Sequence, residues 1–338
     1  MRSRRKGQNC VPGCRSRESR QPMTPSIGVA ILSGGPSAER DVSRVSAAAV
    51  EAALKAIPRF HVQALELGSD TASALMNLKP DVVLPILHGP PGEDGTLQGL
   101  LELLALPYVG SAVAASALAM DKLAAKGVFQ AVGLPTAAFE AIHARIDTPH
   151  LSAKLAGVKA RLGERLVVKP LNQGSALGVT RTETFEELEP AVQTALDYGG
   201  AILIEERIDG REMTVGVLDV DGECLAFPVI EITIPDQTWY DFNHRYTQGA
   251  SAHLMPAPID EDLRAQLQHA AVLAHQALGC RDLSRVDFIV KDESFVVLEV
   301  NTMPGMTPTS LYPEGAEGAG IPFASLLERL IQSALNRR

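Results

Sequence analysis

The chain has 338 residues, of which 46% are hydrophobic and 21% charged, and its formal net charge is −9. This composition excludes extensive disorder and predicts two or three domains with sizeable cores. The negative charge disfavours nucleic acid as a partner, and the uncharged stretch 103–120 holds too many small residues and a proline to be a good membrane span, so we expect buried loop and helix there.

The first 22 residues carry seven arginine or lysine residues and one acidic residue, without the apolar segment of a secretory signal. We predict a disordered basic tail that is not part of the native protein, with Met23 as the functional start; an organelle transit peptide is the alternative. Two of the four cysteines lie in this tail, whereas Cys224 and Cys280 are isolated. Without paired cysteines we expect no zinc motif and no disulfide framework, and we expect a cytoplasmic protein.

After Met23, short apolar runs alternate with helical periodicity. We predict strands at 27–32, 61–67 and 82–87 and helices at 42–56, 75–78 and 96–104. This alternation is typical of a parallel sheet of Rossmann type, in which loops at the carboxyl ends of the strands form sites. Here those loops are residues 34–40 and 88–96. Neither contains the GxGxxG dinucleotide fingerprint, and the sequence has no GxxxxGK[ST] phosphate loop.

The middle of the chain carries a basic loop with glycines. We expect a helix at 121–131, strands at 165–168 and 201–204 and a helix at 184–197. Lys169 ends the first of these strands, and Gly174 and Gly178 flank Ser175 in the following loop. Glycines allow backbone N–H groups to converge on an anion, and the neighbouring lysine favours a phosphate site over a loop that is only flexible.

The last region is predicted to contain strands at 212–218 and 224–230, a helix at 263–278 and a terminal helix from Phe323. Between them, the segment 240–246 is too long and too aromatic for a simple connector, and we interpret it as a lid.

A hairpin with strands at 285–290 and 295–301 is also predicted. With residues 292–294 as its loop, the strand alternation places the apolar side chains together on one face, namely Val286, Phe288, Val290, Val296, Leu298 and Val300.

The polar face of this hairpin pairs Asp287 with Glu299 and Arg285 with Asn301. Two opposed carboxylates repel each other unless a cation compensates them. Two carboxylates and an amide form an all-oxygen set, which suits Mg²⁺ with nucleotide phosphates better than Zn²⁺. A structural ion pair between Arg285 and the acids is the alternative.

A magnesium face, a phosphate loop and a separate α/β unit together predict ATP-dependent chemistry on a small ligand. Six segments carry a more specific pattern: His88-Gly89-Pro90…Gly92-Glu93-Asp94-Gly95-Thr96, Met120-Asp121-Lys122, Val168-Lys169-Pro170, Gly210-Arg211-Glu212, Arg285-Val286-Asp287-Phe288 and Leu298-Glu299-Val300-Asn301-Thr302-Met303-Pro304-Gly305-Met306-Thr307. In type and order they resemble the D-alanine:D-alanine ligases of the ATP-grasp superfamily, from about Ile27 to the last helix.

The resemblance implies an α/β and α+β architecture with the ATP-grasp fold. It implies an N-terminal Rossmann-like domain at 23–110, a central subdomain at 111–205, and a C-terminal subdomain at 206–338 with the lid and the Mg²⁺ site. It further implies a homodimer that uses ATP and two Mg²⁺, with Mn²⁺ as a substitute. ATP would phosphorylate one D-alanine, and the amine of a second would displace phosphate from the acyl phosphate, forming D-alanyl-D-alanine for peptidoglycan.

Residue roles follow from motif position. The residues implied to bind ATP are Lys122, Lys169, Glu205, Glu206, Ile208, Glu212 and Arg245. The implied metal ligands are Asp287, Glu299 and Asn301. The implied substrate contacts are Glu39 and His88 for the first D-alanine, Arg285 and the Gly305 amide for the oxyanion, and Ser310 with Leu311 for the second D-alanine. The implied catalytic residues are Glu39, Arg285, Gly305 and Ser310, together with Ser175 and Tyr246, which would join Glu39 in closing the lid.

Two positions depart from the family pattern: Ala176 stands where a serine is usual, and Arg245 where a lysine is usual. Neither change removes a metal ligand or an oxyanion donor. A D-alanine:D-lactate ligase, or another ATP-grasp ligase with a different acceptor, is the main alternative, and Tyr246 favours the dipeptide over the depsipeptide. The intact acids and lysines disfavour a non-catalytic ATP sensor, and the missing fingerprint disfavours a dinucleotide-binding protein.

Overall fold

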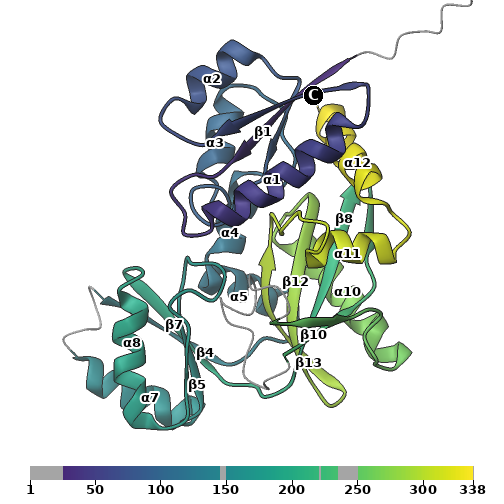
Figure 1. Ribbon diagram of the computed structural model, residues 1–338. Helices are drawn as coiled ribbons and strands as arrows, with labels where there is room; N and C mark the ends of the chain where they lie inside the picture. The colour runs from purple at the N-terminus through teal and green to yellow at the C-terminus, as the bar shows by residue number, and fades with distance from the viewer. Residues whose placement is uncertain (1–25, 145–149, 221, 235–249, 338) are drawn as a thin grey trace, which may run out of the picture.

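The computed structural model describes residues 26–144, 150–220, 222–234 and 250–337. These residues form three separate sheets that follow one another along the chain. Figure 1 shows the first in purple and blue, the second in teal, and the third in green and yellow. Within the described ranges, no helix is both long and apolar enough to cross a membrane.

The first sheet is parallel and has the strand order β2-β1-β3. Its elements are β1 (Ile27–Ser33), α1 (Arg40–Lys55), β2 (Phe60–Glu66), α2 (Thr71–Leu78), β3 (Val82–Pro85) and α3 (Thr96–Leu103). Val29 and Ile31 pack toward α1, whereas Ala30 and Leu32 pack with α2 and α3. Both faces of β1 are therefore covered, which explains its uninterrupted apolar sequence and confirms the predicted α/β unit.

The second sheet is antiparallel and has the order β4-β7-β5-β6. Its elements are β4 (Phe139–His143), α7 (Leu151–Leu162), β5 (Leu166–Pro170), β6 (Thr180–Thr182), the 3₁₀ turn η2 (Phe185–Glu187), α8 (Leu188–Leu196) and β7 (Ala201–Glu206). Leu166 and Val168 point into a core formed with α7 and α8. The alternate residues of β5, Val167 and Lys169, line a cleft on the opposite face.

The third sheet is antiparallel, in the order β11-β10-β8-β12-β13, with β9 paired to β8. Its strands are β8 (Arg211–Val220), β9 (Glu223–Ala226), β10 (Ile230–Thr233), β11 (Ala252–Leu254), β12 (Asp282–Lys291) and β13 (Ser294–Asn301). Its neighbouring helices are α4 (Val113–Met120), α5 (Lys122–Ala131), α10 (Glu261–Ala277), α11 (Leu311–Gly318) and α12 (Phe323–Asn336).

Helices α4, α5 and α10 share one core with this third sheet, around Met213, Val215 and Val217 of β8. The segment 113–134 thus precedes the second sheet in sequence but packs on the third. We retain the division at residues 110 and 205 as a proposal, because the three sheets are separate. Residues 113–134 belong to the proposed central subdomain but pack on the C-terminal sheet.

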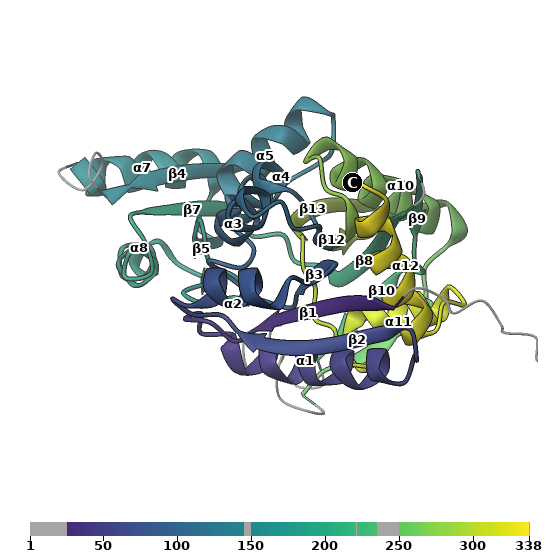
Figure 2. The same ribbon diagram turned by 90° about the horizontal axis from the view of Figure 1, so that it is seen from above.

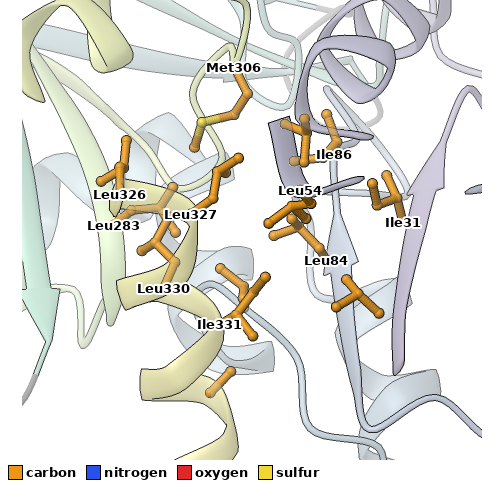
Figure 3. Close-up of a cluster of buried hydrophobic side chains, with 14 of the residues drawn as sticks. Ile31, Leu54, Leu84, Ile86, Leu283, Met306, Leu326, Leu327, Leu330 and Ile331 are labelled. Carbon is orange, nitrogen blue, oxygen red and sulfur yellow. The ribbon is translucent and has the colours of Figure 1, made fainter. Parts of the chain in front are cut away.

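A continuous apolar core joins the first and third units. Figure 3 shows Leu54 of α1 and Leu84 of β3 facing the side chains of α12, among them Leu327, Leu330 and Ile331. Beside this core, the buried carboxylate of Asp282 accepts hydrogen bonds from both NH groups of Arg337, from Ser333 Oγ and from the Gly110 N–H. The C-terminal helix is therefore held by apolar and ionic contacts to the N-terminal unit and to β12.

Candidate active site

A cleft of about 850 Å³, including the open space at its mouth, lies between the second sheet and the β12–β13 hairpin (Figure 1). Six of the predicted ATP-binding residues line it: Lys122, Lys169, Glu205, Glu206, Ile208 and Glu212. Glu299 lines it as well, together with apolar residues such as Val167, Ile289 and Leu298. The fold therefore brings residues as far apart in sequence as 122 and 299 to one cleft, whose wall contains both charged and apolar side chains.

The hairpin has the predicted register at its polar end. Asp287 lies opposite Glu299 and Arg285 opposite Asn301. The predicted loop is wrong, however, because Lys291 pairs with Ser294 and the register shifts after Asp287.

This shift is a bulge that places one extra residue in β13, and it changes which apolar side chains are buried. Val297, not Val296, enters the core with Val300, and Leu298 turns to the cleft. The predicted positions of Val296 and Leu298 on the core face are therefore wrong.

The Asp287 carboxylate is buried and accepts hydrogen bonds from Arg285, Thr214 and Asn301. Arg285 donates from Nε to Oδ1 over 2.9 Å and from an NH2 group to Oδ2 over 2.8 Å. Thr214 Oγ1 donates to Oδ1 over 2.7 Å, and Asn301 Nδ2 donates to Oδ2 over 3.1 Å. Both alternatives drawn from the sequence are thus compatible with this geometry: Arg285 pairs with Asp287, and the three oxygen-bearing residues still converge.

Two lysines approach the cleft from different elements. Lys122, the first residue of α5, places Nζ 2.7 Å from the Gln173 carbonyl oxygen and 3.3 Å from Glu299 Oε2. Lys169, on β5, places Nζ 2.8 Å from Glu205 Oε1. Asp121 caps α5 by accepting from the backbone N–H groups of residues 123 and 124, so the helix start that carries Lys122 is well defined.

Lys126 is a charged residue of this region that the sequence analysis missed. It lies one turn after Lys122, is fully buried, and places Nζ 3.1 Å from Glu205 Oε1. Burial lowers the pKa of Lys126 to about 8, against the opposing effect of Glu205. Burial also opposes ionisation of Glu205, but Lys169 and Lys126 hold its pKa below the usual value. The signal in the sequence was a lysine on the apolar face of α5, four residues after Lys122.

The glycine-bearing loop contacts the N-terminal unit. The Ser175 hydroxyl donates a hydrogen bond to Glu39 Oε1, although these residues are 136 positions apart. Glu39 is buried at the start of α1, and a Cβ atom added to Gly174 would lie 2.9 Å from Glu39 Oε2. The predicted association of Ser175 with Glu39 is therefore present, and Gly174 gives the carboxylate the space it needs.

The 88–96 loop holds the chain segment that follows β13. His88 Nδ1 lies 3.1 Å from the Met303 carbonyl oxygen, while Glu93 accepts from the N–H groups of Gly89 and Met303 over 2.7 Å and 3.2 Å. The backbone N–H and the carbonyl oxygen of Met303 are thus both engaged by one loop. Burial lowers the pKa of His88, so its imidazole is neutral at neutral pH. Its Nε2 atom is buried and has no hydrogen-bond partner among the described residues.

Glu93, like Lys126, is a residue of the site for which no role was predicted from the sequence, although it belongs to the 88–96 motif. Burial and, to a smaller extent, the nearby charge of Glu39 raise its pKa to about 8, against the opposing effect of the two backbone donors. His88, Glu39 and Glu93 therefore form one group of titratable side chains at the end of the first sheet, in which His88 and Glu39 are buried and Glu93 is half-buried.

The predicted residues of the second-substrate site are also close together. A Cβ atom on Gly305 would lie 2.9 Å from Ser310 Oγ, and Ser310 immediately precedes α11. Leu311 is different, because its side chain is buried with Ile230 and Ile232. A substrate contact by Leu311 would have to come from its backbone N–H at the start of the helix. The predicted lid residues Arg245 and Tyr246 lie outside the described residues.

Two family models match most of the chain. Residues 128–332 match the family model described as D-ala D-ala ligase C-terminus, and residues 59–111 match the one described as D-ala D-ala ligase N-terminus. The chain belongs to the D-alanine–D-alanine ligase family. The resemblance inferred from the six sequence segments is thereby confirmed.

Individual members of the family align over nearly the whole chain. The D-alanine–D-alanine ligase of Desulforamulus reducens is 41% identical, with 92% of this chain and 100% of that protein covered. That of Rhodospirillum rubrum is 44% identical, with 90% and 97% covered.

Solved structures agree with these relatives. The D-alanine–D-alanine ligase of Bacillus anthracis complexed with ATP has a TM-score of 0.77 at 29% identity, covering 92% of this chain and 98% of that one. A D-Ala:D-Ser ligase from Enterococcus faecalis has a TM-score of 0.79 at 31% identity, covering 91% and 99%. The fold is accordingly the ATP-grasp fold of this ligase family, with the predicted N-terminal α/β unit.

Proposed function

We propose that the cleft carries out the ATP-dependent joining of two D-alanine molecules to D-alanyl-D-alanine, through an acyl phosphate, for peptidoglycan synthesis. The chain is an ATP-dependent ligase of this family. The observation that supports the assignment of this cleft is its lining, since every described residue implied to bind ATP borders it together with Glu299.

The donor set of the hairpin fits a hard divalent cation. Asp287 and Glu299 are opposed on adjacent strands, Asn301 reaches the Asp287 carboxylate, and neither described free cysteine lines the cleft. These three residues would hold the Mg²⁺ ions, which we expect to be two, and Mn²⁺ would fit the same oxygen ligands. Bound there, the cations would neutralise charge on the transferring phosphoryl group.

Lys122 and Lys169 would contact the nucleotide phosphates from α5 and β5. Their present partners, the Gln173 carbonyl and the Glu205 carboxylate, hold both ammonium groups at the cleft wall. The backbone at Glu206 and Ile208 would accept the adenine ring, and Glu212 would bind the ribose. Arg181, 3.6 Å from Glu212, is an additional cation of the wall.

The first D-alanine would bind where the 34–40 and 88–96 loops meet the glycine-bearing loop. Glu39 is the acceptor for its ammonium group, and the neutral imidazole of His88 adds a second acceptor at Nε2. A neutral acceptor is suited to this position because it binds an ammonium group without repelling it.

Arg285 and the Gly305 amide would stabilise the tetrahedral oxyanion, and Ser310 would bind the carboxylate of the second D-alanine. Asp287 aligns the Arg285 guanidinium through two parallel hydrogen bonds, so its direction is set before a substrate arrives. Donors oriented in this way are worth about 3–4 kcal/mol each in comparable sites. A homodimer is a proposal that rests on the resemblance, and a cytoplasmic location is one that rests on the unpaired cysteines of the sequence.

The test is ADP release by the purified chain with Mg²⁺ and ATP, in the presence of D-alanine, L-alanine, or D-alanine together with D-serine or D-lactate. We expect release that depends on D-alanine, with D-alanyl-D-alanine as the product identified by mass spectrometry. ADP release that is indifferent to D-alanine, or equal with L-alanine, would contradict the assignment. If a mixed product formed in preference, the second substrate would be D-serine or D-lactate and not D-alanine. The protein would still be an ATP-dependent ligase.

A further inference from the structure

A second group of metal-binding side chains lies away from the cleft. Asp219 of β8, Cys224 of β9 and His275 of α10 place one potential ligand atom each within 4.8 Å of the others. Helix α10 packs against both strands, as Figure 2 shows at one edge of the molecule. These three residues are 56 positions apart in sequence at the widest, so only the fold brings them together.

The group faces the side of the third sheet that is opposite to the cleft. Alternate residues of β8 point to opposite faces. Glu212 lines the cleft and Thr214 contacts Asp287, whereas Met213, Val215 and Val217 belong to the core with α10. Asp219 continues this second set and meets His275 of α10.

The geometry of His275 is that of a ligand held by a second residue. Its ring is fully buried, and Nδ1 lies 2.7 Å from Ser284 Oγ, which leaves Nε2 directed to Asp219. Histidines that bind metals are commonly oriented in this way by a hydrogen bond to the other ring nitrogen. The group could not be predicted from the sequence, because its members are far apart along the chain and Cys224 is not part of a paired-cysteine motif.

The distance between two ligand atoms is informative. Nε2 of His275 and Oδ2 of Asp219 are 3.4 Å apart, which is longer than a good N–H···O hydrogen bond. For bond lengths of about 2.1 Å, the edge of a tetrahedral zinc site is about 3.4 Å. The Cys224 side chain is partly exposed on a short strand, accepts a hydrogen bond from Gln276 Nε2 at 3.5 Å, and places its sulfur within 4.8 Å of both other ligand atoms.

We propose that Asp219, Cys224 and His275 form a binding site for one Zn²⁺ ion, with water as the fourth ligand. A thiolate, an imidazole and a carboxylate are the ligand types that Zn²⁺ prefers over Mg²⁺, so this site and the all-oxygen cleft select different cations. The ion would connect the β8–β9 hairpin to α10, and its two anionic ligands balance its charge.

The experiment replaces Zn²⁺ by Co²⁺ in untagged full-length protein, with excess Mg²⁺ present to occupy the oxygen site in the cleft. A thiolate ligand gives a sulfur-to-cobalt charge-transfer band in the near ultraviolet, which an oxygen site does not give. We expect one equivalent of Co²⁺ per chain to produce this band, Zn²⁺ to abolish it by displacement, and Zn²⁺ to raise the melting temperature.

Variants assign the site. Cys224→Ser should lose the band while keeping ligase activity with Mg²⁺, and Asp219→Asn should weaken Zn²⁺ binding by about tenfold or more. Cys280→Ser is the matched control, because Cys280 is the other described free cysteine and lies buried. Cys10→Ser/Cys14→Ser controls for the cysteines outside the described residues. A band that persists in Cys224→Ser, or its absence from the parent protein at excess Co²⁺, would overturn the proposal. The ligase assignment would be unaffected by either result.

Discussion

Glu299 forms an ion pair with Lys122 at the wall of the cleft. Its Oε2 atom lies 3.3 Å from Lys122 Nζ, and its side chain is 24% exposed. Removing the Glu299 charge also relieves its repulsion with the opposed Asp287 carboxylate, so the net effect on stability without metal should be small. A shared metal ligand, in contrast, is needed for phosphoryl transfer.

We predict that Glu299→Gln lowers kcat by at least about a hundredfold and raises the Mg²⁺ concentration required for half-maximal rate. The melting temperature without metal should change little. Glu293→Gln, in the exposed turn of the same hairpin, is the control and should retain full activity. A large loss of metal-free stability in Glu299→Gln, with normal Mg²⁺ dependence, would instead identify Glu299 as a structural ion-pair partner.

Glu93 connects protonation to stability. Burial raises its pKa to about 8 in the folded protein, compared with 4.5 for the unperturbed group. Between these values the folded chain holds a proton that the unfolded chain has lost, so stability decreases as the pH rises from about 4.5 to 8.

A glutamine has no such proton. We therefore expect the stability of the parent protein relative to Glu93→Gln to fall with pH over this window, by up to roughly 1.4 kcal/mol per pH unit. Urea unfolding of both proteins at several pH values measures the difference, and any constant effect of the amide cancels in the slope. Parallel curves for the two proteins would show that Glu93 is ionised in the folded state throughout.

The glycine-bearing loop between β5 and β6 brings the second unit to the first. A methyl group at Gly174 would meet Glu39 Oε2 at 2.9 Å, whereas one at Gly200 would meet no atom within 4 Å. We predict that Gly174→Ala displaces the Glu39 carboxylate or the loop and lowers kcat/KM for D-alanine by about tenfold or more. Gly200→Ala should behave like the parent enzyme in steady-state kinetics. Equal kinetics for both variants would mean that the Ser175–Glu39 contact does not position the substrate.

The hairpin illustrates what can be derived from the sequence. Its polar register follows from alternation, because charged side chains cannot share the core face with valine and phenylalanine. The bulge does not follow, because a two-residue turn with Asp292 at a φ of 52° and a three-residue loop fit the same residues equally well. The position of Leu298 in the cleft wall depends on that bulge and could not be foreseen.

Helix α11 was not predicted from the sequence, because contacts with residues distant along the chain stabilise it. Helix α11 contains Pro313, Gly315 and Gly318, which are poor helix formers, yet it is held by the burial of Tyr312 and by a hydrogen bond from its hydroxyl to the Val217 carbonyl oxygen. Within the site, motif order identified the residues that line the cleft. It could not identify Lys126 or Thr214, whose importance comes from the partners that the fold gives them.

The core shared by α12 and the first sheet joins parts of the chain that are far apart in sequence (Figure 3). Leu330 is fully buried there, whereas Leu103 is 87% exposed. We predict that Leu330→Ala costs about 2–5 kcal/mol of unfolding free energy, and that Leu103→Ala costs about 0.5 kcal/mol or less. Thermal unfolding with two probes, near-ultraviolet dichroism and activity after heating, should show a single early transition for Leu330→Ala. Separate transitions would mean that the N-terminal unit unfolds independently of α12.

The Asp282 carboxylate also has a practical consequence for anyone handling the protein. Its guanidinium partner, Arg337, is the second-last residue of the sequence and also donates to the Tyr108 carbonyl oxygen. A fluorescent or affinity fusion joined at that end would begin beside a buried ion pair, and trimming the last two residues would leave a buried carboxylate without its cation, at a cost of about 3–5 kcal/mol. Tags are better attached ahead of β1, where no such pair would be disturbed among the described residues.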